Sequence, residues 1–161
     1  MSNFTEQFQY ELYDSIVELN DEDRHLILTA KESTKKAYAP YSNFLVGAAA
    51  KLQNGEIVIG ANQENASYPV SICAERTLLS SVAMLYDNIP IITMAITYDY
   101  LKGDSLKPVA PCGMCRQAIL EYEERTQQSM RLILFGKQGK ILIIPKASYL
   151  LPFSFNSTNL L

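Results

Sequence analysis

The period of the hydrophobic pattern changes along this chain, and these changes constrain its fold more than any other feature. Helical periodicity is found over residues 23–38, 73–86 and 112–124. Apolar, β-branched runs of strand length occupy residues 44–52, 56–61, 91–98, 131–135 and 140–144, with a hairpin-type Asn54-Gly55 turn after the first. Helices interleaved with strands predict the α/β class, as a three-layer α/β/α sandwich around a mixed sheet of about five strands.

Particular residues mark where the predicted helices begin and end. Asp21 or Asp23 is expected to cap the start of the first helix, and Pro40 follows its end. Pro111 is expected at the first position of the third helix, where a missing backbone N–H costs nothing.

The N-terminal segment is set apart by its charge. Residues 1–23 carry seven acidic side chains and no Lys or Arg, so with a net charge of −3 for the whole chain the remainder carries +4. We therefore expect an acidic N-terminal extension over residues 1–22 and a single domain over 23–161. Within the extension, a partly ordered segment and a helix laid on the body or on another subunit are both open. The helical alternative rests on apolar residues at four-residue spacing: Phe4, Phe8, Leu12 and Ile16.

Composition excludes several classes of protein. A hydrophobic content of 48% with 19% charged residues is typical of an ordinary soluble globular chain. The basic residues are scattered, whereas a protein that binds nucleic acid needs a basic face to neutralise phosphates. No apolar run reaches the roughly 18 residues of a membrane span, and no basic segment followed by an apolar one marks a secretory signal. We expect a cytoplasmic protein without nucleic-acid or membrane partners.

The cysteines predict a metal site. The chain has three, Cys73, Cys112 and Cys115, and a single histidine, His25. An odd number of cysteines favours metal or thiol chemistry over a disulfide framework. Cys112 and Cys115 are three residues apart at a helix start, so their sulfurs face the same way, and Cys73 at another helix start can supply a third. Thiolate ligands in a tetrahedral arrangement favour zinc.

A site with three protein ligands leaves one zinc position open, which is typical of catalytic rather than structural zinc. Glu75 lies two residues after Cys73 and can border the open position. A carboxylate there can take a proton from a metal-held water and deliver it to a leaving group. Arg76 can donate hydrogen bonds to the sulfurs and withdraw their charge.

Three other interpretations of these residues remain open at this point. Cys112 and Cys115 could form a redox pair, which predicts a disulfide and no metal. The three cysteines could belong to a structural zinc site completed by His25 or by a partner. A zinc-stabilised binding module without catalysis would likewise need a fourth protein ligand, and Glu75 would then be dispensable.

Four motifs resemble those of the homotetrameric, zinc-dependent cytidine deaminase family. They are A-Y-x-P-Y-S-x-F-x-V-G-A-A over 37–49, N-Q-E-N-A-S-Y-P over 62–69, C-A-E-R over 73–76 and P-C-G-M-C-R-Q over 111–117. The resemblance extends from about residue 24 to residue 155. It implies a hydrolase that converts cytidine and 2′-deoxycytidine to the uridines with release of ammonia in pyrimidine salvage, using one zinc ion per chain.

The resemblance also assigns roles to residues. Cys73, Cys112 and Cys115 would hold zinc, and Glu75 would be the proton shuttle. The positions matching substrate-binding residues are Phe44, Asn62, Glu64, Ala66, Tyr68, Ala74 and Phe155. Arg76 and Gln117 are expected around the sulfurs without binding the metal. Phe155 matches an aromatic residue that reaches a neighbouring subunit's site, which implies a homotetramer with shared sites.

The substrate can also be judged from the residues themselves. An Asn-x-Glu pair at a strand end projects both side chains to one side, which suits the hydroxyls of a ribose. A carboxylate at Glu64 would repel a phosphate, which favours a nucleoside over a nucleotide or a polynucleotide. A modified cytidine or an aminonucleoside antibiotic remains an alternative substrate.

Overall fold

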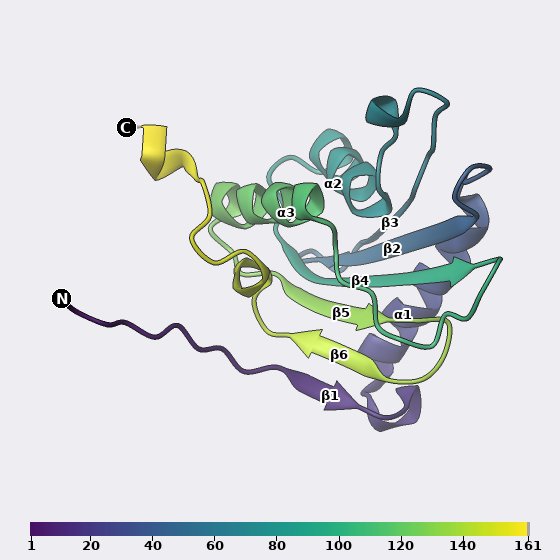
Figure 1. The fold of residues 1–161 in the computed structure, drawn as a ribbon, viewed down its shortest axis with the longest axis horizontal. Helices are drawn as coiled ribbons and strands as arrows, with labels where there is room; N and C mark the ends of the chain where they lie inside the picture. The colour runs from purple at the N-terminus through teal and green to yellow at the C-terminus, as the bar shows by residue number, and fades with distance from the viewer. Residues whose placement is uncertain (161) are drawn as a thin grey trace.

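The computed structural model of this chain describes residues 1–160, and Leu161, the last residue of the expected domain, lies outside them. Its strands and α-helices alternate along the chain (Figure 1). In chain order they are β1 (Glu11–Tyr13), α1 (Asp21–Ser33), β2 (Phe44–Leu52), β3 (Ile57–Ala61), α2 (Ala74–Leu85), β4 (Ile91–Tyr100), α3 (Gly113–Thr126), β5 (Arg131–Phe135) and β6 (Ile141–Ile144). Within residues 1–160, no helix has the length and apolar character needed to cross a membrane.

The strands form one mixed sheet in the order β1-β6-β5-β4-β2-β3. All neighbouring strands are antiparallel except β4 and β5, which are parallel and joined through α3. Gly55 in the β2–β3 turn has a φ of 90°, which confirms the hairpin turn expected from Asn54-Gly55.

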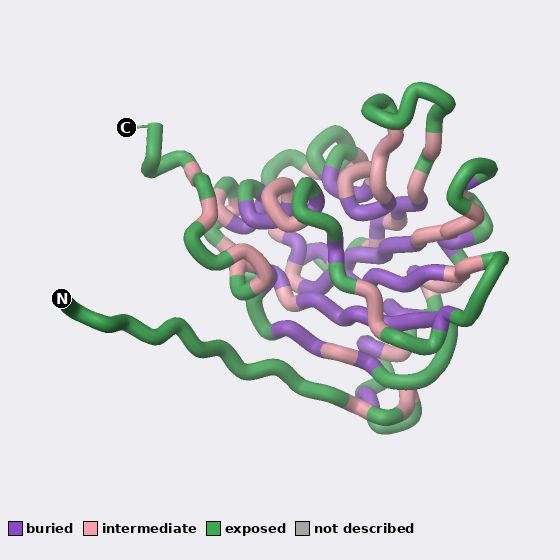
Figure 2. The backbone as a smooth tube through the Cα atoms, viewed as in Figure 1, coloured by how far each residue is buried: buried purple, intermediate pink, exposed green. Residues whose placement is uncertain are grey.

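Helices cover both faces of the sheet (Figure 1). One core lies between the sheet and the pair α2 and α3, and includes Leu78, Ile96 and Ile119. A second core lies under α1 and includes Ile27 and Ile133. The buried stretches in Figure 2 follow the strands and the inner sides of these helices. The expected three-layer α/β/α sandwich is confirmed.

The sheet has six strands, one more than expected. The additional strand is β1, which pairs with β6 through the register Leu12 to Leu142. The helix considered over residues 1–20 is wrong, because this segment satisfies backbone groups at the β6 edge instead of forming a helical face. Residues 1–10 are exposed (Figure 2), but the segment still contacts the body, because the Phe8 ring stacks on that of Tyr149 with 5.4 Å between centroids.

Both expected helix starts also require correction. Asn20 caps α1, and its side-chain oxygen accepts a hydrogen bond from the backbone N–H of Asp23 at 2.9 Å. Neither Asp21 nor Asp23 caps the helix, because both lie inside its first turn, and the two carboxylate oxygens of Asp23 accept hydrogen bonds from Arg131 of β5 at 2.7 and 2.8 Å. Cys112 is the N-cap of α3, so Pro111 precedes the cap rather than occupying the first helical position.

The first turn of α2 lies directly on β3 at Gly60. A Cβ atom at this position would overlap the carbonyl oxygen of Ala74 and lie 2.7 Å from the backbone nitrogen of Leu78. Only a residue without a side chain allows this approach. Because α2 begins at Ala74 with Cys73 as its N-cap, the contact fixes the position of both Cys73 and Glu75.

We predict that Gly60→Ala lowers the free energy of unfolding by about 1–3 kcal/mol, because α2 must move away from β3 to admit the methyl group. Thermal or denaturant unfolding measures this loss. Gly113→Ala is the matched control, since a Cβ atom at Gly113 meets nothing within 4 Å. Equal stability of the two variants would show that α2 is not held at Gly60.

Candidate metal centre and substrate pocket

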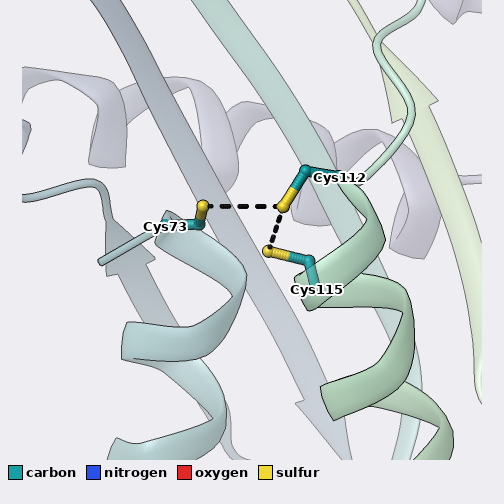
Figure 3. Close-up of side chains that lie close together, drawn as sticks. All are labelled: Cys73, Cys112 and Cys115. Atoms are coloured by element: carbon teal, nitrogen blue, oxygen red, sulfur yellow. Dashed lines mark hydrogen bonds between the residues drawn. The ribbon is translucent and has the colours of Figure 1, made fainter. Parts of the chain in front are cut away.

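The three cysteine sulfurs lie together between the first turns of α2 and α3 (Figure 3). The Sγ atoms of Cys73 and Cys112 are 3.8 Å apart, and those of Cys112 and Cys115 are 3.4 Å apart. Tetrahedral zinc with ligand sulfurs at about 2.3 Å places those sulfurs about 3.8 Å from one another. The cluster therefore fits one zinc ion without rearrangement of either helix.

The cluster offers three protein ligands. Among residues 1–160, no other His, Cys, Asp or Glu side chain joins the group in which all ligand atoms lie within 4.8 Å of one another. His25 is exposed on α1, across the sheet from α2 and α3, so it does not complete the site. The cysteines are free, which does not support a disulfide between Cys112 and Cys115. Three donors leave one position of a tetrahedral ion for water or substrate.

The neighbouring cysteine thiols shift one another's pKa values. The hydrogen bond with Cys115 is the largest influence on Cys73 and lowers its pKa to about 7, against the opposing effect of burial. The same hydrogen bond and burial raise the pKa of the Cys115 thiol. The positive charge of Arg76 also lowers the pKa of Cys73, although no hydrogen bond between its guanidinium and a sulfur is found in the described part of the chain. Cys73 therefore supplies a thiolate more readily than Cys115.

Glu75 is a buried carboxyl group beside this cluster. It is 4% exposed, and burial raises its pKa above the ordinary value for a glutamate. Its side chain lines the same pocket as Cys73 and Cys112. A buried acid at the open side of a metal site can bind and release a proton within the pocket.

The pocket next to the sulfurs has a volume of about 460 Å³. Four of the expected substrate residues line it: Phe44, Asn62, Glu64 and Tyr68. The other three, Ala66, Ala74 and Phe155, do not line this pocket, and Ala74 is fully buried between Cys73 and Glu75.

The pocket also has walls that the sequence analysis did not identify. They are Ser42, Val46, Ser71, Ile72, Ile96, Val109, Ala110 and Met114. Ser42 and Val46 lie inside the A-Y-x-P-Y-S-x-F-x-V motif, and Val109 and Ala110 directly precede Pro111. Met114 lies inside the P-C-G-M-C-R-Q motif. Positions in or next to the motifs could have identified these five residues, but Ile96 required knowledge of how β4 runs beneath the pocket.

Phe44 is held by two tyrosines of the neighbouring strand β4. Its ring stacks on that of Tyr98 with 4.6 Å between centroids and 16° between planes. The Tyr100 ring lies 5.8 Å away at a tilt of 47°. Offset-stacked aromatic rings restrict one another's motion. Phe44 therefore presents a supported aromatic surface at the pocket wall.

Asn62 and Glu64 are oriented by the backbone around β2. The Asn62 amide donates to the carbonyl of Phe44 at 2.9 Å, and its oxygen accepts from the N–H of Val46 at 2.8 Å. Glu64 Oε2 accepts from the backbone N–H groups of Tyr41 and Ser42 at 3.0 and 3.2 Å. Burial opposes ionisation of Glu64, but hydrogen bonds from Ser42 and from these N–H groups lower its pKa. Glu64 is thus held as a carboxylate.

The comparisons with known proteins agree with this geometry. Residues 20–129 match the family model of the cytidine and deoxycytidylate deaminase zinc-binding region, which is the class that the fold and the sulfur cluster define. A cytidine deaminase of Halalkalibacterium halodurans is 37% identical over 135 residues, which are 84% of this chain and 95% of that protein. The chain therefore belongs to the cytidine deaminase family.

Solved structures support the same assignment. The crystal structure of cytidine deaminase from Burkholderia pseudomallei has a TM-score of 0.71 and 38% sequence identity, and the match covers 85% of this chain and all (100%) of that one. The crystal structure of cytidine deaminase from Mycobacterium tuberculosis has a TM-score of 0.65 and 26% identity, covering 85% and 98% of the two chains.

We predict that Cys112→Ala abolishes stable zinc binding and strongly lowers the midpoint of thermal unfolding, because two sulfurs cannot complete the site and metal binding is coupled to folding. Metal analysis should give one zinc per chain for the native protein and close to none for the variant. Removal of zinc from the native chain with a chelator should lower the midpoint similarly. A variant that retained stoichiometric zinc would contradict this ligand assignment.

Proposed function

We propose that this protein catalyses the zinc-dependent hydrolytic deamination of cytidine and 2′-deoxycytidine to uridine and 2′-deoxyuridine, with release of ammonia. The observation that carries the proposal is the buried Glu75 carboxyl group beside a three-sulfur cluster, in a pocket of about 460 Å³. Membership of the cytidine deaminase family supports the same reaction.

The metal-binding cysteines and Glu75 have different roles in the reaction. Cys73, Cys112 and Cys115 would hold the ion, and zinc held there would supply the chemistry of lowering the pKa of a water molecule, so that it could act as a nucleophile at neutral pH. Glu75 would accept a proton from the attacking water as its oxygen bonds to C4 of the cytosine ring, pass a proton to N3, and then help to protonate the amino group as the C4–N bond breaks and ammonia leaves. Burial suits this role, because a raised pKa brings the carboxyl group closer to the pH at which it must both take and give a proton.

Other side chains of the pocket bind the rest of the nucleoside. Phe44, supported by Tyr98, offers a flat apolar surface next to the base. Asn62 and Glu64 bind the ribose hydroxyls, each already oriented through hydrogen bonds to the backbone around β2. Preorganised groups of this kind bind a ligand without an additional ordering cost.

The charges in the pocket favour a substrate without phosphate. The acidic groups in its wall are Glu64 and Glu75, and no Lys or Arg lines it among the described residues. We predict that kcat/KM for cytidine exceeds that for cytidine 5′-monophosphate by at least about a hundredfold, since juxtaposed like charges cost several kcal/mol. Steady-state assays on both compounds measure the ratio, and comparable values would contradict the preference for nucleosides.

We predict that Glu75→Ala lowers kcat by several orders of magnitude while the fold and the zinc content are kept. The loss of absorbance as cytidine becomes uridine measures turnover, and metal analysis checks the site. Glu56→Ala is the control, because Glu56 is an exposed glutamate after the β2–β3 turn. Near-normal turnover by Glu75→Ala would show that another group transfers the proton.

We further propose a cytoplasmic homotetramer that serves pyrimidine salvage and shares its sites between subunits. Phe155 supports this arrangement, because its residue is 60% exposed and it does not line the pocket of its own chain. In the assembly, this aromatic side chain reaches the pocket of a neighbour. Size measurement in solution tests the number of subunits.

Complementation between two inactive or impaired variants tests whether the sites are shared between subunits. Phe155→Ala subunits keep Glu75, and Glu75→Ala subunits keep Phe155, so mixed oligomers restore complete sites. We predict that Phe155→Ala alone raises KM about tenfold, which corresponds to the loss of one aromatic contact. Co-expression of Phe155→Ala with Glu75→Ala should return KM toward the native value. A KM as high in the mixture as in Phe155→Ala alone would exclude a shared site.

A further inference from the structure

Gln117 contacts the C-terminal segment of the chain. It lies in the second turn of α3, two residues after Cys115, and its Nε2 donates a hydrogen bond to the backbone carbonyl of Phe155 at 2.9 Å. The sequence analysis expected this side chain around the sulfurs. Its hydrogen bond places it instead between the helix that carries two metal ligands and the residue proposed to enter a neighbour's site.

The adjacent residue attaches the same segment at a second point. Arg116 Nη1 donates to the carbonyl of Leu150 at 2.9 Å, and its Nε donates to the carbonyl of Pro111 at 2.8 Å. Two consecutive side chains of α3 therefore hold backbone carbonyls on both sides of the turn over residues 151–154. The C-terminal segment runs beside α3 (Figure 1).

The backbone between these two attachment points is also constrained. Phe153 has a φ of 54°, in the left-handed region that few residues other than glycine adopt. Ser154, the last residue of the turn over residues 151–154, leads directly to Phe155. A chain that is bent here and bonded at both ends has few ways to reorient. The hydrogen bond from Gln117 thus decides where the Phe155 ring is presented.

We propose that Gln117 is a positioning residue that acts on the site of a neighbouring subunit rather than on its own. It holds the Phe155 backbone against α3, so that the exposed ring projects from the subunit in one orientation. This inference rests on the proposed function of Phe155 at a shared site. It concerns substrate binding, because the Phe155 side chain has no group that can accept or donate a proton.

The variant that tests this role is Gln117→Met, which keeps the length of the side chain and removes its donor. We expect KM for cytidine to rise about three- to tenfold, which corresponds to the loss of one hydrogen bond between neutral groups, with kcat, zinc content and thermal midpoint close to native. Gln138→Met is the control: Gln138 is exposed in the turn between β5 and β6, and its side chain has no hydrogen bond within the described part of the chain. A native KM for Gln117→Met would overturn the proposal.

Mixed oligomers separate an effect on the neighbour from an effect on the same subunit. When differently tagged Gln117→Met and Glu75→Ala chains are co-expressed and co-purified with zinc, turnover occurs only in the Gln117→Met subunits. Some of these subunits now receive Phe155 from a Glu75→Ala neighbour with a native Gln117. We expect their KM to return toward the native value, whereas a role at the metal of the same subunit would leave KM raised.

The parallel mixture of Phe155→Ala with Glu75→Ala identifies which proposal fails. Rescue of Phe155→Ala without rescue of Gln117→Met would leave the shared site standing and overturn the positioning role. Absence of rescue in both mixtures would overturn the shared site and, with it, the inference about Gln117. Rescue in both mixtures would support both the shared site and the positioning role of Gln117.

Discussion

The contact between the first turn of α2 and Gly60 of β3 is the constraint on which the site depends. It brings a helix start to within van der Waals distance of a strand, and the residues at that start are Cys73 and Glu75. The crossover from β4 to β5 places the start of α3 beside it, with Cys112 and Cys115. One close approach and one crossover connection are enough to gather a metal site and an acid from two separate segments.

The same arrangement gives the two glutamates of the pocket different electrostatic surroundings. Glu75 is buried next to the sulfurs, where desolvation raises its pKa, whereas Glu64 receives backbone hydrogen bonds that lower its own. The pKa values of two glutamates in one pocket are thus shifted in opposite directions because their surroundings differ. This is the condition under which one carboxyl group can exchange protons while the other stays charged for binding.

Local sequence patterns predicted much of this structure, because period, turn residues and ligand spacing are local properties. The β2 limits, the hairpin at Gly55 and the three sulfur ligands follow from a few neighbouring residues. What failed depends on contacts across the fold. Asp23 lies inside α1 and its carboxylate binds Arg131 of β5, and residues 11–13 form a strand because β6 has an open edge. The hydrogen bond from Gln117 to Phe155 spans 38 positions, and no local pattern indicates it.

The positions of the cysteines also imply an order of events during synthesis. Cys73 precedes Cys112 by 39 residues, and the two sulfurs meet only when α2 and α3 are packed on the same sheet. A chain still emerging from the ribosome therefore holds Cys73 without partners until α3 has followed. The neighbouring strand β5 must be added before the crossover that orients α3 is complete. Binding of one zinc ion by all three thiols therefore requires that the central part of the sheet is assembled, and an ion bound earlier by one or two thiols would be held in an incomplete site.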